Sequence, residues 1–91
     1  MILYILKSSL DGTYYTGQTN NLKNRITKHN KGQIKSTKSK APYKLCYFEE
    51  FENRSEAMWK EWELKKKWNT ERRNKLVSSF DKTKLEEFMG L

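Results

Sequence analysis

Strand-like and turn-like stretches alternate at the start of the chain. Residues 2–9 (ILYILKSS) and 13–19 (TYYTGQT) are rich in strand-forming residues, and LDG at residues 10–12 supplies turn residues between them. Two such runs around a short turn predict a β-hairpin over residues 1–19. A third run, YKLCYFEEF at residues 43–51, predicts another strand.

Helical patterns follow the hairpin. From residue 20 to about Asn30 the apolar positions have helical spacing, Thr19 or Asn20 can cap this helix, and Gly32 can end it. Asn53 and Glu56 resemble a capping box at the start of a second helix that runs to about Trp68.

Two shorter helices are expected near the end of the chain. The first lies in TERRNKLVSSF (residues 70–80), and the second, capped by Asp81, uses Leu85, Phe88 and Met89 as its apolar side. Residues 31–42 show little periodicity and read as a mobile basic loop. The order ββαβαα, followed by the terminal helix, predicts an α+β fold: a small three-stranded antiparallel sheet flanked by helices.

Polar residues interrupt the apolar face of the first predicted helix. Leu22, Arg25, Ile26 and His29 are three, four and seven positions apart, so they share one face. Residues 23, 24, 27 and 28 already provide a solvated side. We therefore expect the arginine and the chain's single histidine to face the sheet.

The second predicted helix shows a similar interruption. Ala57, Glu61, Leu64 and Trp68 have helical spacing, which places a carboxylate within an apolar row. Two interpretations are open. In the first, Glu61 lies at the margin of the apolar row or pairs with a lysine such as Lys65. In the second, Glu61 faces a reaction centre. Trp59 and Trp62 are expected to be core residues, although either could stack on an exposed base.

Two tyrosines of the hairpin are expected on one face of the sheet. Tyr4 and Tyr15 have odd separation, so any loop with an even number of residues gives them the same face. A four-residue loop would set them opposite each other, whereas a two-residue Asp-Gly turn would pair Tyr15 with Ser8. Gly17, on the same face, removes a side chain where a phosphate or a helix could approach.

Charge is concentrated in one segment. The chain carries a net charge of +8, and between Gly12 and Phe48 it has no acidic residue. The lysines expected to contact phosphates in this segment are Lys23, Lys28, Lys31, Lys35, Lys38 and Lys40. This distribution favours a polyanionic partner held through its backbone. One cysteine and one histidine argue against a structural zinc site, and no apolar run predicts a membrane span, so a cytoplasmic protein is expected.

Five separated segments resemble the GIY-YIG nuclease superfamily, and in particular its small stand-alone bacterial members. They are LYIL (3–6), YTG (15–17), LKNR (22–25), KHNKG (28–32) and SEAMWKEWELKKKW (55–68). The resemblance covers about residues 1–80, which we take as the nuclease-like domain. Residues 81–91 would form a helical extension packed on it.

The resemblance implies catalytic roles for Tyr4, Tyr15, Arg25, His29 and Glu61, with Glu61 as the ligand of Mg²⁺ or Mn²⁺ and Gly17 close to the nucleic acid. It implies a metal-dependent endonuclease that hydrolyses phosphodiester bonds in DNA. One tyrosine would activate water, and Arg25 would stabilise the transition state. The alternatives are a non-catalytic nucleic-acid-binding module, or a domain that docks on a protein partner which supplies target specificity.

Overall fold

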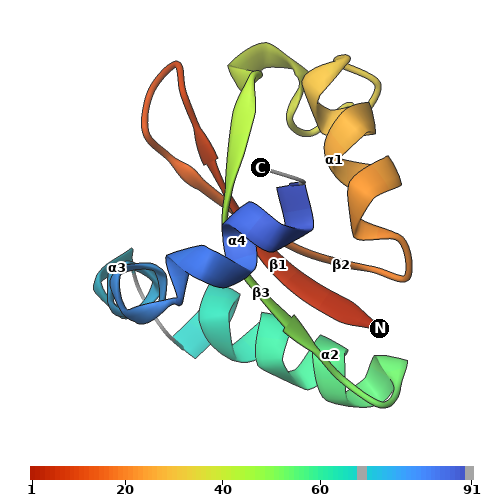
Figure 1. Cartoon of the computed structure of the whole chain (residues 1–91), viewed down its shortest axis with the longest axis vertical. Helices are drawn as coiled ribbons and strands as arrows, with labels where there is room; N and C mark the ends of the chain where they lie inside the picture. Colours follow the sequence, from red (N-terminus) through yellow and green to blue (C-terminus); the bar gives the residue numbers. More distant parts are fainter. Residues whose placement is uncertain (68–69, 90–91) are drawn as a thin grey trace.

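A three-stranded antiparallel sheet with strand order β2-β1-β3 forms the centre of the molecule (Figure 1). The computed structural model describes residues 1–67 and 70–89. Its elements are β1 (Ile2–Ser8), β2 (Tyr14–Thr19), α1 (Leu22–Asn30), the 3₁₀ turn η1 (Lys38–Lys40), β3 (Tyr43–Glu50), α2 (Arg54–Trp62), the π-helical turn η2 (Glu63–Lys67), α3 (Thr70–Ser79) and α4 (Lys82–Met89). The predicted α+β class and the order of its elements are confirmed.

The two faces of the sheet are covered by different helices. α1 and α4 lie on one face, where Leu22 of α1 and Phe88 of α4 belong to the same apolar cluster. α2, η2 and α3 cover the other face, where Leu64 of η2 packs in a second cluster. Figure 1 shows α1 and α2 on opposite sides of the sheet. Helices α1 and α4 therefore share one face of the sheet, and α2, η2 and α3 share the other.

The hairpin register differs from both registers that the sequence suggested. Tyr4 lies opposite Gly17, and Tyr15 lies opposite Leu6. The strands are connected by residues 9–13, and Lys7 and Tyr14 are the last residues paired between them. The two tyrosines still share a face, as predicted, but they are diagonal neighbours instead of a direct pair.

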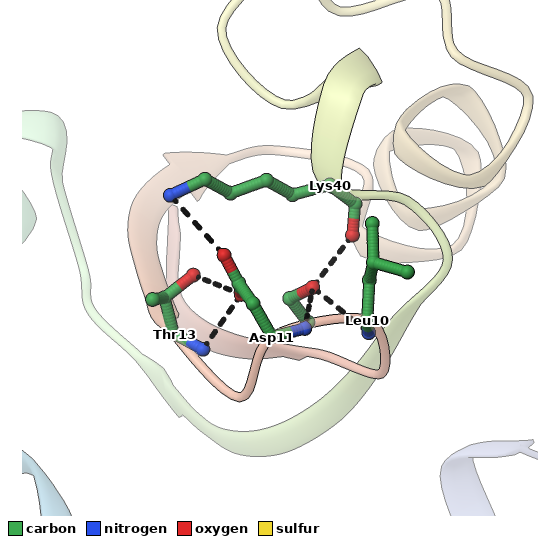
Figure 2. A network of polar contacts seen from close by, with 5 residues as sticks. Leu10, Asp11, Thr13 and Lys40 are labelled. Atoms are coloured by element: carbon green, nitrogen blue, oxygen red, sulfur yellow. Dashed lines mark hydrogen bonds and ion pairs between the residues drawn. The ribbon is translucent and has the colours of Figure 1, made fainter.

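Side chains of the hairpin loop stabilise this longer connection. The hydroxyl of Ser8 accepts hydrogen bonds from the backbone N–H groups of Leu10 and Asp11, at 3.1 and 3.3 Å. The carboxylate of Asp11 accepts two more from Thr13, at 3.0 Å from the backbone nitrogen and 2.7 Å from the hydroxyl (Figure 2). These bonds satisfy the turn locally, which is why the short Asp-Gly turn does not form.

The same hairpin loop also anchors the lysine-rich residues 31–42, called the basic segment below. Ser8 donates its hydroxyl proton to the carbonyl oxygen of Lys40 at 2.7 Å, and the Lys40 ammonium lies 3.5 Å from the Asp11 carboxylate (Figure 2). Residues expected to form a mobile loop are thus tied to the hairpin and include the 3₁₀ turn η1. The anchored loop brings Thr37 beneath α1.

The helix boundaries follow from identifiable caps. The side chain of Asn21, and not of Thr19 or Asn20, caps α1 by accepting a hydrogen bond from the Asn24 backbone at 3.1 Å. Gly32 follows that helix with φ of +73°, a conformation that glycine adopts without strain.

The second helix begins and ends differently. Asn53 caps α2 as predicted, at 3.0 Å from the Glu56 nitrogen. Beyond Trp62 the chain continues as the π-helical turn η2 instead of regular α-helix, so the predicted α-helix to Trp68 was too long. Trp68 itself lies outside the described residues.

Candidate functional site

The hydroxyl of Tyr4 is the centre of a polar group under α1. It lies 3.0 Å from Nε2 of His29 and accepts a long hydrogen bond of 3.5 Å from Nε of Arg25. Tyr4 and His29 are both fully buried. The helical spacing that placed Arg25 and His29 on the sheet-facing side of α1 is confirmed, because both side chains reach the central strand.

Thr37 holds the other side of the His29 ring. Its hydroxyl lies 2.7 Å from Nδ1 of His29 and donates to the carbonyl oxygen of Ile34 at 3.4 Å. A hydroxyl that donates to Ile34 accepts from Nδ1–H, which leaves Nε2 as the acceptor for the Tyr4 proton. Every polar atom of this buried chain then has a partner.

Burial keeps the two central groups neutral. It lowers the pKa of His29 to about 4, with a smaller effect in the same direction from the Arg25 charge. Burial also raises the pKa of Tyr4 to about 12, although the hydrogen bond from Arg25 opposes this change. The bond to Tyr4 raises the pKa of Arg25. At neutral pH the site therefore holds one fixed cation beside a neutral phenol and a neutral imidazole.

Tyr15 completes the aromatic part of the site. Its ring lies 6.2 Å from the Tyr4 ring and 5.0 Å from the His29 ring, measured between centroids. Unlike Tyr4, it is only partly buried.

Gly17 makes room for this arrangement. A Cβ atom on Gly17 would lie 2.6 Å from the Tyr4 hydroxyl and 3.0 Å from the Tyr15 ring. The space freed by the glycine is thus taken by Tyr4. Contact of Gly17 with nucleic acid stays a prediction.

Glu61 approaches the site from α2, at the edge of the sheet formed by β2. Its Oε2 atom lies 3.6 Å from the Lys65 ammonium, which in turn lies 5.7 Å from the centre of the Tyr15 ring. The Glu61 charge also contributes to the raised pKa of Tyr4. The pairing of Glu61 with Lys65 that the sequence suggested is confirmed, whereas a role of Glu61 in a reaction centre stays a prediction.

The donor set suits one hard cation bound mainly by water and phosphate. Among the residues that the structure describes, no group of three His, Cys, Asp or Glu side chains could enclose a metal ion. Glu61 offers a partly buried carboxylate that already holds a cation, the Lys65 ammonium. Mg²⁺ and Mn²⁺ accept oxygen ligands, and Mg²⁺ typically keeps several waters, so a single carboxylate fits such an ion.

The six lysines predicted to contact phosphates are all exposed. Two of them have contacts of their own: Lys40 pairs with Asp11, and the Lys23 ammonium lies 5.7 Å from the centre of the Phe88 ring. The structure also shows that no helix within residues 1–67 and 70–89 is long and apolar enough to cross a membrane.

Sequence reasoning missed Thr37 as a residue of the site. It lies in a segment without periodicity, and only the tertiary position of the loop brings it to His29. Lys65 was considered solely as a partner of Glu61. Its spacing of four residues from Glu61 was the available signal, whereas its position over Tyr15 required the fold.

Comparisons with known proteins show the family of this chain. Residues 1–75 match the profile of the GIY-YIG catalytic domain. A UPF0213 protein of Clostridium perfringens is 51% identical over 65 residues, which span 70% of this chain and 69% of that protein. A UPF0213 protein of Staphylococcus saprophyticus is 42% identical over 77 residues, or 84% of this chain and 92% of that protein.

A solved structure has the same fold. The solution NMR structure of a UPF0213 protein from Bacillus halodurans superposes with a TM-score of 0.55 at 36% identity, covering 85% of this chain and 81% of that one. The resemblance first seen in five short segments is thereby confirmed over most of the chain. The protein belongs to the GIY-YIG family, whose catalytic domain makes up residues 1–75.

Proposed function

We propose that this protein is a divalent-metal-dependent endonuclease that hydrolyses phosphodiester bonds in DNA. The observation that carries the proposal is the arrangement around the Tyr4 hydroxyl, which lies between Nε2 of His29 and Nε of Arg25 in a protein of the GIY-YIG family. A binding module has no need of a buried phenol, an imidazole and a guanidinium in one group, since exposed lysines suffice for phosphate contact.

The two tyrosines differ in solvent exposure, and we assign them different roles on that basis. Tyr4 is fully buried and its hydroxyl is engaged by two side chains, so it positions Arg25 and His29. Tyr15 is partly exposed and lies beside the Lys65 cation. We therefore assign to Tyr15 the contact with the attacking water. The Tyr15 hydroxyl orients this water by accepting a hydrogen bond from it; the water oxygen forms a bond to phosphorus, one ester P–O bond breaks, and the proton released by the water leaves on the departing ester oxygen.

Arg25 supplies the fixed positive charge for the phosphate. Its planar guanidinium can bond two phosphate oxygens as negative charge develops on them, and its bond to Tyr4 holds it in position beforehand. Glu61 would hold the divalent ion, which when bound polarises the phosphate and lowers the pKa of bound water. The exposed lysines of the basic segment would hold the DNA backbone without reading its sequence.

The test is cleavage by the purified protein. Linear, nicked and branched DNA are incubated with the protein in Mg²⁺ and, separately, in EDTA. We expect cleavage only with Mg²⁺, and a loss of at least 100-fold in Glu61→Ala with DNA binding retained. Glu86→Ala, an exposed carboxylate on α4, is the matched control and should cleave normally. Salt-dependent binding by the wild-type protein without any cleavage would favour the binding module instead.

A further inference from the structure

Helix α2 carries an exposed aromatic surface on the side that does not pack on the sheet. The side chains of Trp59, Trp62 and Met58 are 63%, 45% and 49% exposed. The two indole rings are stacked, with centroids 5.3 Å apart and an angle of 17° between their planes. Together with Ser55 they line a shallow hollow of about 270 Å³. We call these four residues the Trp platform.

The fold does not account for this surface. α2 packs on the sheet through Ala57, and η2 through Leu64; both are fully buried. The expectation that Trp59 and Trp62 would be core residues was therefore wrong. Two adjacent tryptophans left half exposed on a small protein make an apolar patch of the kind that marks a binding surface.

One end of the Trp platform, at Trp62, adjoins Glu61 along α2. Glu61 and Trp62 are neighbours on α2, and successive residues of an α-helix point about 100° apart. Trp62 therefore lies about 100° around the helix from Glu61, and Trp59, two positions before Glu61, lies on the side away from it. The Lys65 ammonium contacts Glu61 and lies over the Tyr15 ring. A cation is therefore present near the C-terminal end of α2.

Size and charge argue for a small anionic ligand on the Trp platform. A stable protein interface uses about 20–30 residues on each side, whereas the platform has four. A second copy of this chain would bring another net charge of +8 to a protein that already carries it. A flat, uncharged ring attached to phosphate fits better, because it stacks on indole while its phosphate meets the neighbouring cation.

We propose that the Trp platform is a nucleobase-binding subsite, which stacks an unpaired base beside the phosphodiester at Glu61. This inference rests on the proposed function for the identity of the neighbouring site. A base within a continuous duplex has both faces covered by its neighbours in the stack. The subsite therefore favours substrates with unpaired nucleotides at the cleavage point over continuous duplex.

Measuring DNA affinity in EDTA, where no cleavage is expected, separates the contribution of base stacking from that of catalysis. Affinities for three labelled probes are measured in EDTA by fluorescence anisotropy: single-stranded DNA, an abasic strand of the same length and charge, and a duplex. We expect Trp59→Ala and Trp62→Ala each to weaken binding of the single strand about tenfold, and Trp59→Phe to retain most of it. Binding of the abasic strand and of the duplex should not change.

Controls separate this result from other causes. Leu10→Ser replaces a side chain that is 70% exposed in the hairpin loop, and it should bind all probes as the wild type does. Circular dichroism should show unchanged folding in both tryptophan variants. Equal losses on the single strand and the abasic strand would overturn the subsite. A dimer that Trp59→Ala converts to a monomer would overturn it too, since the platform would then be an interface between copies.

Cleavage in Mg²⁺ distinguishes the two proposals. Wild-type cleavage that Trp59→Ala leaves unchanged on branched DNA would overturn the subsite and leave the nuclease assignment standing. Base-dependent binding at the tryptophans in a protein that cleaves nothing would support the subsite and overturn the nuclease assignment.

Discussion

The Tyr4 hydroxyl lies 3.0 Å from Nε2 of His29, although the two residues are 25 positions apart in the chain. The contact joins the central strand β1 to the end of α1. Thr37 of the basic segment bonds the other nitrogen of the His29 ring. A change at any of these three residues should therefore affect both stability and the site.

Stability should fall on acidification because His29 is buried as a neutral ring. Its pKa is lowered to about 4 in the folded protein, whereas an unfolded chain has a value near 6.5. Between these values the unfolded state binds more protons, so the free energy of unfolding is complete above pH 6.5 and declines towards pH 4. We expect His29→Gln to remove the part of this decline that His29 causes, about 2 kcal/mol between pH 6.5 and 4.5. Urea unfolding of both proteins across this range measures it, and identical slopes would contradict the account.

Replacing Thr37 should test the anchored loop. Thr37→Val has nearly the same shape but lacks the hydroxyl that lies 2.7 Å from Nδ1 of His29. A buried N–H without a partner costs about 1–3 kcal/mol, and the imidazole loses its fixed orientation. We expect that destabilisation in thermal unfolding, together with lower cleavage activity. Thr27→Val on the exposed side of α1 is the matched control. Equal stability of the two variants would show that the Thr37 contact is dispensable.

Gly17 should tolerate no side chain because Tyr4 occupies the space. In Gly17→Ala the new Cβ would lie 2.6 Å from the Tyr4 hydroxyl, so the phenol must move away from His29. Overpacking of this kind costs about 1–3 kcal/mol. The same change made in a Tyr4→Phe protein removes the closest clashing atom and should cost less. A double-mutant cycle in urea measures this coupling, and additive effects would mean that the clash is relieved elsewhere.

Lys65 should compete with the metal for Glu61. Its ammonium lies 3.6 Å from the carboxylate, so a divalent ion has to displace it. We expect Lys65→Met to raise Mn²⁺ affinity several-fold in calorimetric titration. Stability should change by less than about 0.5 kcal/mol, because the pair is partly exposed. Lys75→Met on α3 is a control that should bind Mn²⁺ as the wild type does. Unchanged or weaker affinity in Lys65→Met would show that the lysine does not occupy the metal position.

Helical periodicity was the most informative part of the sequence. A period of 3.6 residues determines which side of a helix faces the sheet, so Arg25 and His29 could be placed before the fold was known. The capping side chain of Asn53 was predictable for the same local reason.

Features that depend on tertiary contacts were not predictable. The hairpin register is set by hydrogen bonds of Ser8 and Asp11 within the loop, which the strand pattern does not encode. Thr37 reaches His29 because Lys40 is tied to that same loop. The exposure of Trp59 was misjudged because an apolar residue on a helix is usually buried, and the alternative requires knowing which side of α2 the sheet covers.

We propose that Glu61 of α2 holds a divalent ion near Tyr15 of β2 and Arg25 of α1, so that side chains from three distant segments form one site. Paramagnetic broadening by Mn²⁺ in NMR spectra of the whole protein tests it most directly. We predict that substoichiometric Mn²⁺ broadens the amide signals of Glu61, Tyr15 and Arg25 together, and that Glu61→Ala abolishes this effect. Broadening centred on Glu49 and Glu50 of β3, unchanged in Glu61→Ala, would contradict the account.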